Sequence, residues 1–190
     1  GQDTVPGGAR PGCVTIMTIH RSKGLQFPVV LVADTARRFN AADTRQPVLL
    51  HRMYGAGLRL RPEEGEGAYK TAAYTALSNV HAAEMRSEQM RLLYVALTRD
   101  KLILTVPLGI GKTSNPFARA AAFLEAGAGQ TLCRQANSFA DWLRAALLVH
   151  PNGGPLRRLA EDLELPFADT GSTITLTVQQ ALPEGVEPPD

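Results

Sequence analysis

The sequence has few cysteines, few aromatic residues, almost no net charge and no long hydrophobic run. Its two cysteines, Cys13 and Cys133, lie far apart in 190 residues, which excludes a disulfide scaffold and fits a reduced, cytoplasmic protein. A net charge of +2 gives no bulk field for a polyanion, so nucleic acid would have to be bound by a few placed residues. No apolar run approaches the roughly 18 residues of a membrane helix, and no signal peptide opens the chain, so we expect no membrane partner.

The remaining composition is that of an ordinary globular protein, with 44% hydrophobic and 20% charged residues. The length suits one well-buried domain, or one domain with an appendage. Residues 1–12 are rich in glycine and proline and are expected to form a disordered lead-in. Residues 182–190 are rich in proline and acids and are expected to form a linker. Because the sequence does not begin with methionine, we interpret it as an internal piece of a longer protein.

Three apolar runs predict strands buried on both faces of a parallel sheet, at residues 14–19, 29–33 and 101–106. Residues 69–99 contain no proline or glycine and predict a long helix before the third strand. The order of strands and helix predicts an α/β fold. The polar segment after the first run is then expected beyond the carboxyl ends of the strands, where open α/β sheets bind ligands.

Residues Met90, Leu93, Tyr94 and Leu97 follow helical spacing, so we expect this stripe, Tyr94 included, to face a core. The other predicted elements are a hairpin of residues 48–51 and 57–60, helices over 116–125, 138–148 and 156–163, and an exposed-face strand over 173–178. Trp142 is expected to anchor its helix by packing.

Two longer motifs carry functional information. A glycine and a lysine after a strand are by themselves an ordinary turn, but T-I-H-R-S-K-G-L-Q-F-P-V-V at Thr18 to Val30 resembles motif V of UvrD-type superfamily I DNA helicases. The string E-Q-M-R-L-L-Y-V-A-L-T-R at Glu88 to Arg99 resembles motif VI of the same family. Segments 39–43, 48–57 and 138–143 are similar to the AddA branch, the helicase/nuclease component of AddAB-type enzymes.

The resemblance implies an α/β, RecA-like (P-loop NTPase-type) parallel sheet flanked by helices. Residues 13–107 would be the C-terminal part of the second RecA-like helicase domain, and residues 108–181 a helical or mixed extension toward a possible nuclease domain. The parent protein would be an ATP-dependent 3′–5′ DNA helicase/exonuclease of double-strand break repair and recombination. It would use ATP and Mg²⁺. Its partners would be single- and double-stranded DNA, the first RecA-like domain of the same parent chain, and an AddB-type subunit.

Arg99 ends the predicted long helix and directly precedes a predicted strand, so its guanidinium can be held rigidly at the edge of the sheet. Such a cation stabilises a transferring phosphoryl group and is worth ~10³–10⁵ in rate. From the residues alone, a helix-end arginine neutralising the helix dipole is the simpler interpretation. The resemblance implies instead that Arg99 is the catalytic arginine finger. It also places Gly24, Gln26 and Arg91 at the ATP site, Arg91 as a brace.

The resemblance further implies that the polar loop contacts DNA. A histidine just past a strand end, with basic neighbours, suits contact with a nucleic-acid backbone, whereas a lone histidine is more commonly a satisfied core residue. The residues expected to bind DNA are Thr18, His20, Arg21, Ser22 and Lys23.

The sequence departs from the family pattern at two places. Gln26 stands where relatives have a glutamate near the nucleotide sugar, although an amide can still hydrogen-bond a ribose hydroxyl. After Arg99 the chain reads D-K-L, two residues shorter than the family's A-K-E-K-L. These departures favour the alternative of a non-catalytic RecA-like DNA-binding or protein-interaction module.

A third possibility, a free-standing small-molecule α/β enzyme, has no catalytic constellation in its favour. The string G-I-G-K-T at 109–113 lacks the first glycine of a Walker A loop, since Val106 stands there. Because no Walker A or Walker B motif is present, we expect the isolated chain to hydrolyse no ATP and to bind no cofactor.

Overall fold

A computed structural model describes residues 13–62, 67–108, 116–127, 129–159, 171 and 174–177. The chain divides into two compact units. The first contains residues 1–109 and 136–139, and the second contains residues 110–135 and 140–190. The predicted lead-in, the linker, the G-I-G-K-T string and the tip at 63–66 lie outside the described residues.

The first unit contains a parallel pair of strands, β1 (Phe27–Leu31) and β5 (Asp100–Thr105). Phe27 pairs with Asp100 and Leu31 with Thr105, and the register shifts between Phe27 and Val29. The shift falls at Pro28, which has no N–H to donate to the ladder. The predicted parallel pairing of the second and third runs is therefore confirmed, with strand bounds that differ by one or two residues.

The first apolar run is not a strand, and the prediction for residues 14–19 is wrong. Val14 and Ile16 are 93% and 95% exposed, and β1 pairs only with β5 among the described residues. A strand needs a neighbour for its N–H and C=O groups, and this run has none there. The prediction of burial on both faces also fails, because two strands cannot cover their own side chains: Val29, Leu31, Leu102 and Ile103 are all exposed.

The predicted long helix is confirmed as α1 (Ala72–Leu97), a 26-residue helix. Thr71 caps its N-terminus, since the Thr71 hydroxyl accepts a hydrogen bond from the Tyr74 N–H at 3.1 Å. The predicted apolar stripe is only partly correct. Leu93 is buried, but Tyr94 is 70% exposed, so its expected place in the core is wrong. The two ends of α1 contact different elements, a β-hairpin and a short helical turn, and Tyr94 faces neither core.

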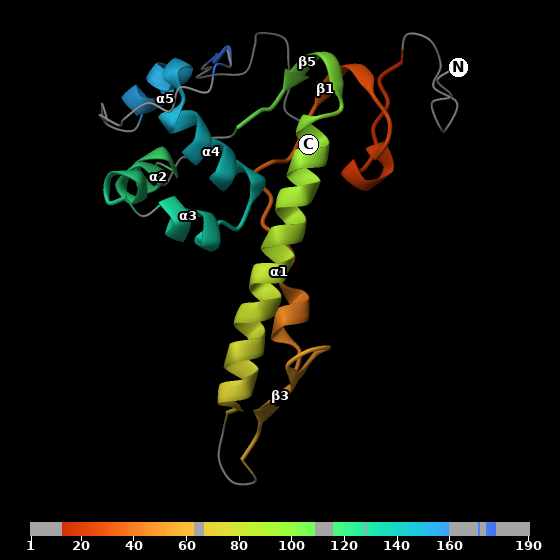
Figure 1. Cartoon of the computed structure of the whole chain (residues 1–190), viewed down its shortest axis with the longest axis vertical. Helices are drawn as coiled ribbons and strands as arrows, with labels where there is room; N and C mark the ends of the chain where they lie inside the picture. Colours follow the sequence, from red (N-terminus) through yellow and green to blue (C-terminus); the bar gives the residue numbers. More distant parts are fainter. Residues whose placement is uncertain are drawn as a thin grey trace, which may run out of the picture. The chain divides into compact units, whose positions relative to one another are not determined.

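The β-hairpin packs on the first half of α1 (Figure 1). It consists of β2 (Val48–His51) and β3 (Gly55–Leu60), which are antiparallel, with the short β4 (Tyr69–Lys70) beside β3. A 3₁₀ turn, η2 (Ala42–Arg45), precedes it. Leu49 forms a small buried cluster with Tyr74 and Leu77 of the helix, so the predicted hairpin is confirmed.

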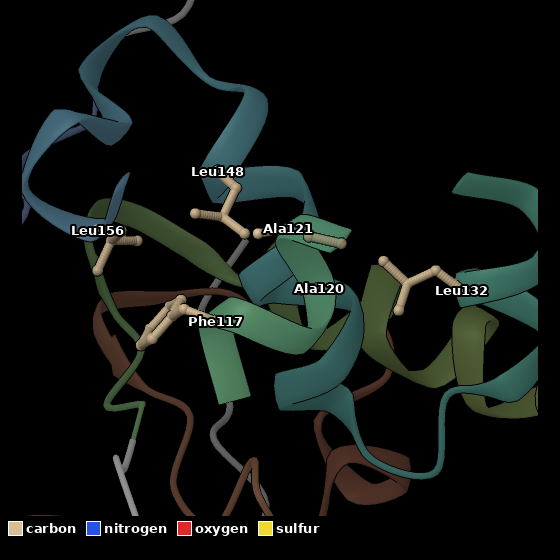
Figure 2. Close-up of a cluster of buried hydrophobic side chains, with 7 residues drawn as sticks. Phe117, Ala120, Ala121, Leu132, Leu148 and Leu156 are labelled. Atoms are coloured by element: carbon tan, nitrogen blue, oxygen red, sulfur yellow. The ribbon is translucent and has the colours of Figure 1, made fainter. Parts of the chain in front are cut away.

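The second unit is helical. Its elements are α2 (Pro116–Glu125), α3 (Gly129–Gln135), α4 (Phe139–Val149), the 3₁₀ turn η3 (Pro151–Gly153) and α5 (Gly154–Leu159). The side chains of its core are Phe117, Ala120, Ala121, Leu132, Ala145, Leu148 and Leu156 (Figure 2). The predicted helices over 116–125 and 138–148 are confirmed, and α5 covers the start of the third. Residues 174–177 form no strand.

Side-chain contacts with main-chain carbonyls fasten the helices of this unit. Trp142 is buried, and its indole N–H donates to the Cys133 carbonyl at 3.1 Å, so the predicted anchor is confirmed. Arg157 donates to the carbonyls of Leu148 and His150 at 2.8 and 2.9 Å, which satisfies the end of α4. In the described part of the chain, no helix is long and apolar enough to cross a membrane.

Gly57 allows the hairpin to approach α1 closely. A Cβ at this position would lie 2.5 Å from the Tyr74 Cα and 2.7 Å from the Tyr74 nitrogen, and backbone atoms cannot swing away. We therefore expect Gly57→Ala to lower the free energy of unfolding of the chain by about 1–3 kcal/mol through overpacking, measured by urea denaturation.

Gly154→Ala is the matched control, because Gly154 has helical angles and the nearest atom to an added Cβ is 3.8 Å away. We expect no loss of stability there. An equal denaturation midpoint for the two variants would contradict the close approach.

Candidate functional site

The polar loop between the first apolar run and β1 folds as a 3₁₀ turn, η1 (Ile19–Ser22). It precedes β1, and the end of α1 precedes β5, so both segments lie at the amino ends of the two parallel strands. This corrects the expectation that the loop lies beyond carboxyl ends. That expectation depended on a strand over residues 14–19, which does not form.

Local hydrogen bonds hold the loop in shape. The Thr18 hydroxyl accepts from the Arg21 N–H at 3.4 Å, and the Thr18 carbonyl accepts from the same N–H at 3.0 Å. The Ser22 hydroxyl is buried and donates to the Ile19 carbonyl at 2.7 Å. Gly24 has a φ of +82°, in the region that favours glycine. The turn therefore reverses the chain within a few residues of β1.

The outer side of the loop is cationic and open to solvent. His20, Arg21 and Lys23 are all exposed, as is Gln26. Residues 13–27 contain no aspartate or glutamate, so the positive charge of this segment is not neutralised from within. Among the residues predicted to contact DNA, only Ser22 has its side chain turned inward.

The guanidinium of Arg99 is held by three acceptors. Its Nε donates to the Val95 carbonyl at 2.9 Å, its Nη1 to the Leu25 carbonyl at 3.2 Å, and its Nη2 to the Thr98 hydroxyl at 3.0 Å. The Phe27 N–H also donates to the Arg99 carbonyl at 2.9 Å. Side chain and main chain of Arg99 are thus both fastened to the segment that joins the loop to β1.

Thr98 occupies a position that the sequence did not single out. Its hydroxyl accepts from Arg99 and donates to the Tyr94 carbonyl at 2.8 Å. The hydroxyl therefore bridges the last turn of α1 and the guanidinium, and it limits the rotation of Arg99. A threonine directly before a candidate arginine was the available signal, but the Leu25 carbonyl, as a main-chain group, left no signal in residue type.

The two sequence motifs therefore meet at one place. Although about seventy residues separate them, Arg99 contacts the loop at Leu25, between Gly24 and Gln26. η1 also packs against α1. The structure brings together an exposed cationic turn and a fixed arginine, joined by one main-chain carbonyl.

Arg91 is not part of this arrangement. It forms an exposed ion pair with Glu88 at 3.2 Å and lies about two helical turns before Arg99. Such i,i+3 surface pairs contribute little to stability. Arg91 therefore reaches the site only if it exchanges Glu88 for another partner.

Neither a metal cluster nor the one marked pKa shift lies at this site. Among the described residues, no group of three or more His, Cys, Asp or Glu side chains is placed to hold a metal ion. In the second unit, burial lowers the pKa of the Arg144 guanidinium, and Asp141 at 3.5 Å opposes that shift.

Comparison with known proteins gives a consistent result. The family model of the UvrD-like helicase C-terminal domain matches residues 6–108, more than half of the chain. The chain is 41% identical over 170 residues to the ATP-dependent helicase/nuclease AddA of Desulforudis audaxviator, covering 84% of this chain and 14% of that protein. It is 38% identical over 148 residues to the protein of the same name from Listeria monocytogenes, covering 76% of this chain and 12% of that protein.

A third relative, the ATP-dependent helicase/nuclease AddA of Alkaliphilus metalliredigens, is 35% identical over 181 residues, or 92% of this chain and 15% of that protein. The chain thus spans about one seventh of the length of these curated relatives. The aligned region includes both the cationic turn and Arg99.

Proposed function

Because the chain belongs to the family of UvrD-like helicase C-terminal domains, we propose that it is part of the second RecA-like motor domain of an ATP-dependent DNA helicase/nuclease. The observation that carries this proposal is the hydrogen bond between the Arg99 guanidinium and the Leu25 carbonyl. It ties a candidate phosphate-contacting group to a candidate DNA-contacting loop.

Arg99 has the properties needed for contact with the γ-phosphate. A guanidinium is always charged, and its planar donors suit phosphate oxygens. Phosphoryl transfer needs little from the protein beyond positioning and charge stabilisation, and a group held by three acceptors is already positioned. Gly24 leaves space for backbone approach to ATP, and Gln26 is placed to hydrogen-bond the ribose. In this proposal Mg²⁺ is held by the first RecA-like domain of the parent chain.

The cationic turn supplies part of the single-stranded DNA track. His20, Arg21 and Lys23 would contact phosphates, which position a strand without reading its sequence. Thr18 would contact DNA near its capping position. We assign Ser22 to this track as well, through its hydrogen bond to the Ile19 carbonyl, which fixes the turn that presents its neighbours.

The exposed sheet supports a place inside a larger domain. β1 and β5 leave apolar side chains open to solvent, as expected of strands whose neighbours come from elsewhere in the polypeptide. We propose that the rest of the same RecA-like domain covers them, that the first RecA-like domain faces Arg99 across the nucleotide, and that an AddB-type subunit completes a cytoplasmic repair complex.

The second candidate is a RecA-like module that binds DNA or protein without taking part in catalysis. Gln26 favours it, since an amide cannot supply the negative charge of the family's glutamate. So does the engagement of all three guanidinium nitrogens of Arg99 by protein acceptors, because a finger must exchange at least one of them to reach phosphate.

Arg99→Ala in the complete polypeptide distinguishes the two candidates. We expect DNA-stimulated ATP hydrolysis to fall by about 10³-fold or more, since an arginine finger contributes on that order, while ATP binding measured by a fluorescent analogue stays nearly unchanged. Arg134→Ala is the charge-matched control, because Arg134 is exposed on α3, and it should leave turnover unchanged. Normal turnover by Arg99→Ala would favour the non-catalytic module.

Thr98 is a positioning residue in this proposal. Thr98→Val keeps the shape but removes the hydroxyl that holds Arg99, and a hydrogen bond to a charged group is worth about 1.5–3 kcal/mol. We expect kcat for ATP hydrolysis to fall about tenfold or more, with KM for ATP and thermal stability nearly unchanged. Thr98→Ser should retain most of the wild-type kcat. If the valine and serine variants have equal kcat, the hydroxyl does not position Arg99.

The DNA track is tested by the salt dependence of binding. Lys23→Ala and Arg21→Ala should each weaken single-stranded DNA binding at low salt and reduce the slope of log K against log salt by about 0.7, the value for one lost phosphate contact. Arg37→Ala is the control, since Arg37 is exposed and ion-paired with Asp34 at 3.9 Å. A slope that changes equally in all three variants would show only a general charge effect.

A further inference from the structure

The β-hairpin carries an apolar surface that the proposed motor function does not use. Residues 49 and 57 are paired and face α1, so their strand neighbours on either side face away from it. The register places three pairs on this opposite face: Val48 with Leu58, Leu50 with Ala56, and Leu60 with Tyr69. We call these six residues the outer hairpin face.

Every position of the outer hairpin face is apolar, and every one is exposed. Exposure reaches 70% at Leu50, and Met53 at the hairpin turn is 74% exposed. An antiparallel sheet with one face on a helix normally carries polar residues on the other. The alternation expected for a solvated face is missing, and a contiguous exposed apolar patch of this kind marks a docking surface.

The border of this face is basic. The charged residues described between positions 45 and 70 are Arg45, Arg52, Arg59, Arg61 and Lys70, and all are exposed. The glutamates at 63, 64 and 66 lie outside the described residues. A surface with an apolar centre and this border fits a partner with apolar side chains at its centre and carboxylates around them.

We propose that the outer hairpin face is covered by another segment of the same polypeptide, an amphipathic segment with an acidic border. The chain spans only 11–15% of the length of its curated relatives, so most of such a polypeptide lies outside it. A segment of the same polypeptide is present at a high effective concentration. No other occupant needs so little intrinsic affinity.

A second copy of the chain is a poorer occupant. Two outer hairpin faces packed together would bring two basic borders against each other, and like charges across an interface are costly. This argument does not use the cationic turn or Arg99, so the proposal holds whether or not the motor function does.

Site-specific photo-crosslinking in the complete polypeptide tests the occupant. A benzophenone amino acid replaces Leu50 in one variant and Asn79, which is exposed on α1, in the control. We expect the Leu50 probe to cross-link to a peptide from outside these 190 residues without a band of higher mass. A band of two chain masses, a band containing a different protein, or a yield no greater than at Asn79 would each overturn the proposal.

Limited trypsin digestion of the complete polypeptide gives a second readout. The border residues Arg52 and Arg59 are trypsin sites, and a docked segment protects them. Leu50→Gln with Leu58→Gln should accelerate cleavage at these sites about tenfold, because cleavage follows the population of the open form. Asn79→Gln, the control, should leave the cleavage rate unchanged. Equal rates in the double variant and the wild type would mean that no segment covers the face.

Discussion

The hydrogen bond from the Arg99 guanidinium to the Leu25 carbonyl, at 3.2 Å, is the contact on which the arrangement of the site depends. It joins the end of a 26-residue helix to the end of a cationic turn across a separation of 74 residues. The Phe27 N–H fastens the same two segments through the main chain. Neither segment can shift without disturbing the other, so binding events at the two segments are physically linked.

The parallel sheet imposes the second constraint. Two strands position the turn and the arginine side by side, because parallel strands place their amino ends at the same edge. They do not bury their own side chains, and an apolar parallel sheet is stable only when both faces are covered. The unit that holds the site therefore depends on further chain for part of its stability, which agrees with its match to one region of much longer relatives.

Sequence reasoning predicted the elements whose signals are local. The long helix, the hairpin and the pairing of the second and third apolar runs follow from helix propensity, alternation and β-type composition. It failed at residues 14–19 because a strand is a property of two segments, and no described neighbour pairs with this one. It placed Tyr94 in a core because helical spacing shows that residues share a face but not what covers it. Within the site, motif resemblance selected Arg99 and the loop, whereas the acceptors that hold Arg99 are main-chain carbonyls and Thr98.

Helix α1 connects the two surfaces for which we propose partners. Its first half packs against the hairpin and its last residues hold Arg99, and a helix of this length extends about 39 Å. A helix transmits displacement as a rigid body when it is fastened at both ends, as α1 is by Gly57 and Tyr74 at one end and by Thr98 at the other. A segment that docks on the outer hairpin face would thus act on the same rigid element as the nucleotide. The apolar hairpin and the arginine are far apart in space, but they are neighbours in mechanical terms.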